Sequence, residues 1–438
     1  MRTPLARAAV VLLLAATLVA GCSTEVERTT TTHVRVLPNG VTVYAQENRA
    51  SDVVSVQAWV RDGALFEKRE EAGIAYLLSS AMFDQSEARG PGEIKVSIEK
   101  LGGGLSPMCR HDYTQHVVVV PAAHFDTATE ILVEGLLHPV FDEARVERVK
   151  ARIISDLPSL ERRWMDQAYL LCLEELFGDH PYSRLPQGSP ETLAGITAED
   201  LAARHRDRYV ASNLVMVVSG SVPTDVAADR IEEMISSLEP GERARPAAEP
   251  IVWPSATRRR IERAGVTKAY QVAAFPGPCV TDEDSITMDV LLIVLERGRS
   301  SRLNRIVREE RGLVQSIGAG WYTQLQPSPL FVWMEASPDK IEEAEEAVVS
   351  VLAGLAKEPI TEHELEKAKT ILEASTLFDH ETAEMQAFYY GYWASIGGIE
   401  FADRYFNRLQ EVTAGEIQEA AARHFSSGVH VTAAILPE

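Results

Sequence analysis

The stretch Gly73-Ile-Ala-Tyr-Leu-Leu-Ser-Ser-Ala-Met-Phe83 decides how the first half of this 438-residue chain is interpreted. Its apolar residues recur at positions i, i+3, i+4, i+7 and i+8, and they are Ile74, Leu77, Leu78, Ala81 and Met82. This spacing gathers apolar side chains on one face of a helix. The sequence therefore predicts an amphipathic helix over residues 71–83 that packs this face on a core.

The same stretch resembles the active-site helix of the pitrilysin/insulinase (inverzincin) family of peptidases, which typically reads G-L-A-H-F-L-E-H-M-L-F. In the family's H-x-x-E-H motif the two histidines bind zinc and the glutamate activates a bound water. Here Tyr76 and Ser80 stand at the histidine positions and Ser79 at the glutamate position. Zinc prefers thiolate, imidazole and carboxylate ligands, and a hydroxyl has no accessible deprotonated state to serve as a general base. The resemblance therefore implies a peptidase fold without peptidase chemistry.

The family takes its third zinc ligand, a glutamate, from a second helix that reads like V-I-L-E-E-I. The matching stretch here is Arg152-Ile-Ile-Ser-Asp-Leu157, which places Asp156 at the ligand position. One carboxylate cannot make a three-ligand catalytic zinc site. We therefore expect no catalytic residue, no metal ligand and no enzyme activity by this chain alone, with Tyr76, Ser79, Ser80 and Asp156 as degenerate positions.

A second motif lies in the other half of the chain. The stretch Arg302-Leu-Asn-Arg-Ile-Val-Arg-Glu-Glu-Arg-Gly-Leu-Val-Gln315 resembles the family's S-R-L-F-R-x-L-R-E-E-R-G-L-A-Y. In that family the arginine before E-E-R-G and the closing tyrosine face the bound peptide. The resemblance implies a substrate-binding role for Arg308, which is kept, and for Gln315, which replaces the tyrosine. The alternative for Arg308 is an ordinary surface ion pair with Glu309 or a neighbour.

The first residues have the pattern of an export signal. Arg2 and Arg7 precede an apolar run over residues 8–20, which ends in Leu18-Val-Ala-Gly-Cys22. This ending resembles the lipobox of bacterial lipoproteins, in which the cysteine becomes lipidated, and Ser23 resembles the residue that follows it in lipoproteins of the outer membrane. We expect a signal peptide over 1–21, a lipid anchor at Cys22, and a location in the bacterial cell envelope, at the periplasmic face of the outer membrane. The alternative is an ordinary secretory signal that happens to contain a cysteine.

Composition and the order of the predicted elements limit the class of ligand, the fold class and the domain organisation. The formal net charge of −21 argues against nucleic-acid binding through a global basic surface. Strands and helices without regular βαβ alternation predict an α+β fold, and the resemblance implies two related domains, each a mixed, mostly antiparallel sheet with helices on one face. We predict a tether over 22–32, the domains over 33–238 and 259–438, and a linker over 239–258.

Cys109, His111 and Tyr113 offer a different chemistry. They alternate along a predicted strand and would therefore face one way. With Asp156, the first two could form an unorthodox metal site. The three cysteines other than Cys22, which are Cys109, Cys172 and Cys279, do not form the even set of a disulfide framework.

Three functions remain open. Bacterial members of the family often work as two chains, of which one carries H-x-x-E-H and zinc; this chain would then be the non-catalytic subunit, which binds peptide and completes the chamber at the membrane. It would form a heterodimer with the H-x-x-E-H chain, although a homodimer is also open. The alternatives are an active metalloendopeptidase with the unorthodox site, and a peptide-binding envelope lipoprotein without proteolysis.

Overall fold

A computed structural model describes residues 31–160, 163–244 and 250–438. The predicted signal peptide and lipidated Cys22 lie outside these residues. Thr32–Glu438 form one unit, and the paragraphs below concern this unit. In the described ranges, no helix combines the length and the apolar character needed to cross a membrane.

The first half of the chain builds a six-stranded sheet in the order β1-β2-β6-β3-β5-β4. Strand β2 runs parallel to β6, whereas the β6–β3, β3–β5 and β5–β4 pairs are antiparallel. The central strands are rich in valine, a β-branched residue that suits a sheet buried on both faces. The strands are β1 (Thr31–Val36), β2 (Thr42–Glu47), β3 (Val53–Val60), β4 (Gly104–Cys109), β5 (Thr114–Pro121) and β6 (Leu214–Gly220).

Helices from the same half cover one face of this sheet. The predicted amphipathic helix is α2, and the five apolar residues of its predicted face are all buried, which confirms that prediction. The helices of this half, apart from α6, are α2 (Ile74–Ala81), α3 (Glu93–Lys100), α4 (Phe125–Leu137), α5 (Glu143–Leu160), α7 (Pro190–Gly195), α8 (Ala198–Arg208) and α9 (Thr224–Ile235).

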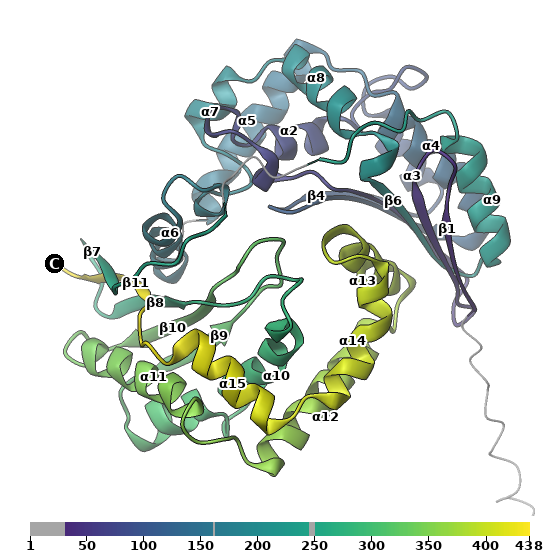
Figure 1. Cartoon of the computed structure of the whole chain (residues 1–438). Helices are drawn as coiled ribbons and strands as arrows, with labels where there is room; N and C mark the ends of the chain where they lie inside the picture. Colours follow the sequence, from purple (N-terminus) through teal and green to yellow (C-terminus); the bar gives the residue numbers. More distant parts are fainter. Residues whose placement is uncertain (1–30, 161–162, 245–249) are drawn as a thin grey trace, which may run out of the picture. The chain divides into compact units, whose positions relative to one another are not determined.

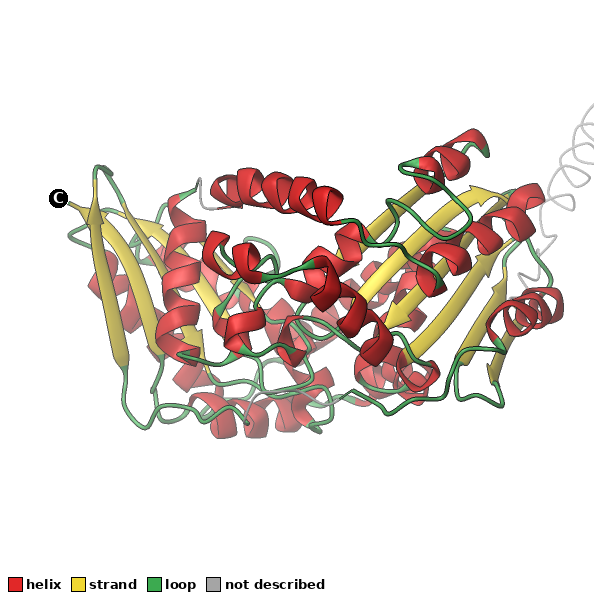
Figure 2. Ribbon diagram, turned by 90° about the horizontal axis from the view of Figure 1, so that it is seen from above, coloured by secondary structure: helices red, strands yellow, loops and turns green. Residues whose placement is uncertain are grey.

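The second half builds a five-stranded sheet in the order β7-β11-β8-β10-β9, in which only the β7–β11 pair is parallel. Its strands are β7 (Arg258–Ala264), β8 (Ala269–Phe275), β9 (Ser316–Gly320), β10 (Leu330–Ala336) and β11 (Val431–Pro437). Its helices, apart from α13, are α10 (Asp284–Glu296), a π-helical segment (Leu303–Glu310), α11 (Ile341–Leu355), α12 (Glu362–Asp379), α14 (Ile399–Glu411) and α15 (Ala414–Phe425). Two mixed, mostly antiparallel sheets with packed helices confirm the predicted α+β fold class; Figure 2 shows the sheets as separate groups of strands.

The two halves exchange one helix each. Helix α6 (Trp164–Phe177), from the first half, packs on β8 and β11 of the second sheet, whereas α13 (Ala383–Ile396), from the second half, packs on β3 and β6 of the first (Figure 1). Arg61 extends the second contact by donating a hydrogen bond of 2.8 Å to the carbonyl oxygen of Ala394, near the end of α13. The predicted domain boundaries stay a prediction, and the structure adds that each half covers part of the other's sheet.

Candidate functional site

Helix α2 starts at a tight turn against a neighbouring loop. Its N-cap, Gly73, has a φ of 96°, and a Cβ at this position would lie 2.7 Å from the carbonyl oxygen of Gln187. Only glycine meets both conditions without strain. The Glu67 carboxylate accepts hydrogen bonds from the backbone N–H groups of Gly73 at 2.9 Å and of Ala75 at 2.8 Å. It thereby satisfies donors that the first turn of a helix leaves without a partner.

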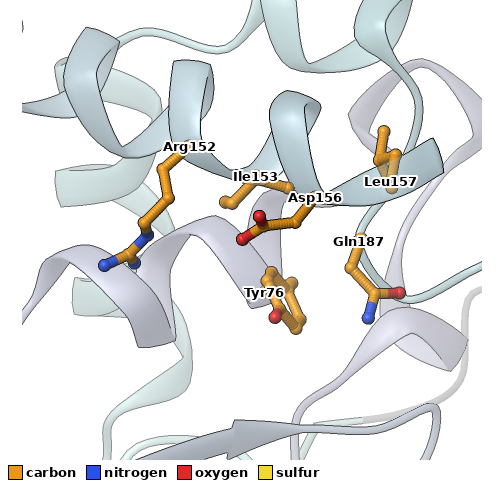
Figure 3. Close-up of a pocket in the computed structure, with 6 residues that line it drawn as sticks. All are labelled: Tyr76, Arg152, Ile153, Asp156, Leu157 and Gln187. Atoms are coloured by element: carbon orange, nitrogen blue, oxygen red, sulfur yellow. The ribbon is translucent and has the colours of Figure 1, made fainter. Parts of the chain in front are cut away.

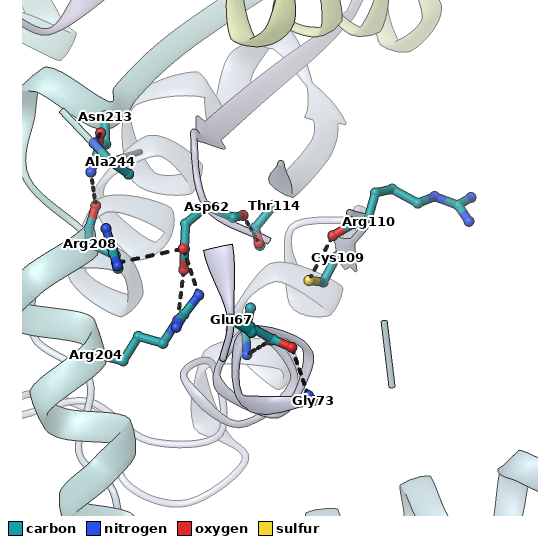
Figure 4. A network of polar contacts seen from close by, with 11 residues as sticks. Asp62, Glu67, Gly73, Cys109, Arg110, Thr114, Arg204, Arg208, Asn213 and Ala244 are labelled. Carbon is teal, nitrogen blue, oxygen red and sulfur yellow. Dashed lines mark hydrogen bonds and ion pairs between the residues drawn. The ribbon is translucent and has the colours of Figure 1, made fainter. Parts of the chain in front are cut away.

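A buried ion pair lies near this turn (Figure 4). Asp62 is 1% exposed and accepts hydrogen bonds from Arg204 through Nε at 3.0 Å and a terminal nitrogen at 2.7 Å. Such a two-bond fork fixes the arginine geometrically. Burial raises the pKa of Glu67 to about 7, although Arg204 and the two N–H donors act in the opposite direction. The α2 turn therefore depends on a carboxyl group that titrates near neutral pH.

A pocket of about 360 Å³ lies between α2 and α5. Tyr76 lines it from α2, Asp156 from α5 and Gln187 from the loop that packs on Gly73 (Figure 3). The structure thus brings together Tyr76 and Asp156, two of the four predicted degenerate positions. Ser79 is 2% exposed and Ser80 is half-buried, and neither lines the pocket.

The donors of this pocket do not fit zinc. They comprise one carboxylate, a phenol and an amide, whereas catalytic zinc sites use three nitrogen, sulfur or carboxylate ligands. Across the residues that the structure describes, no group of three His, Cys, Asp or Glu side chains is placed to hold a metal ion. We therefore derive no catalytic step through zinc in this pocket.

The expectation that Cys109, His111 and Tyr113 alternate along one strand is wrong. Strand β4 ends at Cys109 and β5 starts at Thr114, so the chain turns between them and the period of two is lost. His111 Nε2 lies 2.9 Å from the carbonyl oxygen of Arg184, and burial lowers its pKa to about 4. Burial, with the charge of Glu67, raises the pKa of the Cys109 thiol, so the thiol stays protonated at neutral pH.

The predicted substrate-binding residues lie in the second half. Arg308 is exposed on the π-helical segment, while the neighbouring Glu309 and Glu310 pair with Arg299 at 3.2 Å and Arg305 at 2.7 Å. In the described ranges Arg308 itself has no ion pair. The expected alternative, a surface pair with Glu309 or a neighbour, is therefore not what the structure shows. The Gln315 side chain is also exposed, and its backbone N–H donates to the Glu335 carbonyl oxygen at 2.7 Å.

Comparison with known proteins decides the family. Residues 42–184 match the family model described as insulinase (peptidase family M16), and residues 195–372 match the model described as the peptidase M16 inactive domain. The chain belongs to the pitrilysin/insulinase family. The predicted resemblance is thereby confirmed across both halves.

Curated relatives and solved structures are consistent with this family. The chain is similar to the uncharacterized zinc protease YmxG of Bacillus subtilis, at 25% identity over 78% of this chain and 83% of that protein. It is similar to an uncharacterized zinc protease of Rickettsia felis, at 24% identity over 90% and 95% of the two chains. The structure of a protease from Helicobacter pylori superposes with a TM-score of 0.85 at 18% identity, over 93% of this chain and all of that one. The peptidase M16 inactive domain from Pseudomonas fluorescens superposes with a TM-score of 0.84 at 20% identity, over 93% and 98%.

Three contributors to the site were not singled out from the sequence. Arg152 lines the pocket one turn before Asp156, and the i, i+4 spacing could have indicated it. Gln187 reaches the pocket from a loop that has no periodic pattern. Glu67 lies in a short 64–71 segment between β3 and α2, where the sequence gives no signal that its carboxylate turns inward to cap α2.

Proposed function

We propose that this chain is the non-catalytic subunit of a two-chain zinc peptidase of its family. It binds peptide and completes the chamber, while a homologous chain with an intact H-x-x-E-H helix brings the zinc and the general base. The observation that carries the proposal is the pocket between α2 and α5, where Tyr76 and Asp156 meet at the ligand positions and the donor set does not fit zinc. The relatives named as zinc proteases support a metal-dependent activity for the assembled pair.

Two features support peptide binding. The exposed Arg308 guanidinium is available for a peptide carbonyl or carboxylate, since its acidic neighbours pair elsewhere. Strand β4, which contacts α2, ends the strand order of the first sheet. Its outer edge has no strand partner in the described part of the chain, and such an edge can accept an extended peptide.

The proposal includes a membrane anchor. A diacylated Cys22 would hold the subunit at the periplasmic face of the outer membrane, with residues 22–32 as the tether. The support is the sequence pattern of residues 1–22.

Affinity capture tests the assembly. The tagged, membrane-anchored chain is purified from its native envelope, and the proteins that accompany it are identified and quantified by mass spectrometry. We expect a near-stoichiometric chain that carries H-x-x-E-H, and peptidase activity only in the pair. Recovery of the chain alone, or as a homodimer without activity, would replace the proposal with a binding lipoprotein. Activity and tightly bound zinc in the isolated chain would replace it with an active peptidase.

A further inference from the structure

A second, larger pocket is lined by both exchanged helices and by strands of the second sheet. Its volume is about 970 Å³. The turn between β4 and β5 lines it on one side, α6 and α13 contribute side chains, and β9, β10 and their connection complete it. The degenerate metal site is separate, because the two pockets share no lining residue.

Two groups of aromatic rings line this pocket. In the first group Tyr392 of α13 packs against Tyr113 at a ring-centroid distance of 5.8 Å and against Phe388 at 6.0 Å. In the second group Tyr169 of α6 meets Phe331 of β10 edge-to-face at 4.9 Å. An aromatic lining suits an aromatic ligand, since ring pairs attract beyond the area that they bury.

Tyr113 has a hydrogen-bonding group without a partner. It is 7% exposed and lines the pocket, yet its hydroxyl makes no hydrogen bond to the described residues. Two neighbouring hydroxyls of the pocket have partners, because Tyr182 donates to Asp112 at 2.6 Å and Tyr392 to the Thr323 carbonyl oxygen at 2.6 Å. Burial raises the pKa of Tyr113 to about 12, so its hydroxyl keeps its proton. The hydroxyl is open to the pocket, where it can donate to an acceptor on a ligand.

One arginine of the pocket has no ion pair to the described residues. Arg110 lines the pocket and is exposed, and its Nε contacts only the Met108 sulfur, at 3.2 Å. The other arginine of the pocket, Arg163, is neutralised by Asp166 at 2.8 Å. Asp112 also lines the pocket and accepts from Tyr182, so the lining is not positive overall. The Arg110 guanidinium is nevertheless exposed and can bind an anionic group on a ligand.

We propose that this pocket binds an aromatic side chain of a peptide together with a carboxylate adjacent to that side chain. The ring packs against the aromatic lining, the Tyr113 hydroxyl donates to the bound peptide, and Arg110 pairs with the carboxylate. The carboxylate comes from an acidic neighbour or from a free C-terminus. The inference rests on the proposed function for its premise that the ligand is a peptide.

Peptide titration into the full-length chain in detergent tests the ligand chemistry. The probe is acetyl-Ala-Glu-Phe-Ala-Ala-amide, followed by calorimetry and by tryptophan fluorescence, since Trp333 lines the pocket. Replacing the phenylalanine by alanine, or the glutamate by lysine, is expected to weaken binding at least about ten-fold. Acetyl-Ala-Ala-Ala-Ala-Phe with a free C-terminus, compared with its amide, tells whether a terminal carboxylate serves as well as an acidic neighbour. Equal affinity for the phenylalanine and alanine peptides, or no binding at all, overturns the proposal.

Matched variants locate the site. Tyr322 is 64% exposed and lines the pocket, whereas Phe378 is 67% exposed on α12 and does not. Tyr322→Ala is expected to weaken binding about ten-fold, Phe378→Ala to leave it unchanged, and Arg110→Gln to abolish the preference for glutamate over lysine. Equal binding by Tyr322→Ala and Phe378→Ala would place the peptide elsewhere and refute the proposal. Selective peptide binding without a captured H-x-x-E-H chain would refute only the proposed function, and capture without aromatic selectivity would refute only this inference.

Discussion

At the scale of single residues, the most direct prediction concerns the three replaced positions of α2. Tyr76→His with Ser79→Glu and Ser80→His rebuilds the motif, and Asp156 already lines the same pocket as Tyr76. We expect the triple variant to retain about one zinc per chain after dialysis, because two imidazoles and a carboxylate satisfy zinc. Metal analysis of the dialysed protein checks this.

The control for that experiment keeps Tyr76 and carries only Ser79→Glu and Ser80→His. It has one imidazole fewer in the pocket, so we expect no retained zinc. A triple variant that folds like the wild type yet binds no zinc would show that residues 73–83 do not occupy the peptidase frame.

Glu67 predicts a pH dependence of stability. Burial raises its pKa to about 7 from an ordinary value of 4.5. As pH rises, Glu67 loses its proton in the unfolded chain before it does so in the folded protein. Its contribution to the free energy of unfolding is therefore fully present below about pH 4.5 and is lost as pH rises through about 7. We expect the unfolding free energy of the wild type to fall relative to Glu67→Gln by on the order of 3 kcal/mol between pH 4.5 and 8.

Urea unfolding of both proteins at the two pH values measures this difference. Other buried carboxyls, such as Asp112, whose pKa is raised to about 6 by burial, titrate in both proteins and cancel in the comparison. A pH-independent difference would contradict the assignment of Glu67 as a neutral-pH titrating group.

At the scale of elements, the packing of α13 on the first sheet depends on a glycine. A Cβ at Gly391 would lie 2.1 Å from Nε1 of Trp59, which is fully buried and cannot retreat. Gly391→Ala gains about 1 kcal/mol of helix propensity, but overpacking a buried contact costs about 1–3 kcal/mol. We expect a net loss of stability in urea unfolding.

Gly354 of α11 is the matched control. It lies in a helix and has no atom within 4 Å of the site of a Cβ. Gly354→Ala is expected to stabilise the protein by about 0.5–1 kcal/mol. If both variants gained stability, the contact between α13 and Trp59 would not be as close as described.

The elements also show where sequence reasoning succeeds. The spacing of the apolar residues over 71–83 predicted helix α2 and its buried face, because this period depends only on neighbouring residues. The sequence did not predict the turn between β4 and β5. Residues 109–113 alternate as they would in a strand, although the backbone reverses there. Alignment with the family motifs correctly brought Tyr76 and Asp156 together, since both line one pocket. The aromatic pocket could not be predicted in this way, because its residues lie far apart in the sequence, from Arg110 to Tyr392, and no local sequence pattern connects them.

At the scale of the whole molecule, the helix exchange predicts that the halves stay together without a covalent link. The buried side chains of α6 include Leu173 and Leu176, which pack with residues of the second sheet such as Val272 and Ile435. Separation would expose this surface to water at a high cost in free energy. We expect a chain cleaved at a protease site inserted in the predicted linker, residues 239–258, to elute as one species in size-exclusion chromatography.

The same experiment in urea gives the control, because the cleaved halves then separate. Either half expressed by itself is expected to be insoluble or unfolded by circular dichroism. Independent elution of two folded halves in native buffer would contradict the role given to α6 and α13.

The position of β11 has a consequence for how the protein is made. This strand, Val431–Pro437, lies between β7 and β8 in the second sheet, although it is synthesised long after both of them. Until the ribosome has added these residues, β7 has no strand partner in the described part of the chain and α6 has only part of its docking surface. A chain that stops before Val431 therefore exposes the apolar residues of α6 and β8 that β11 covers, and chaperones and proteases can reach them.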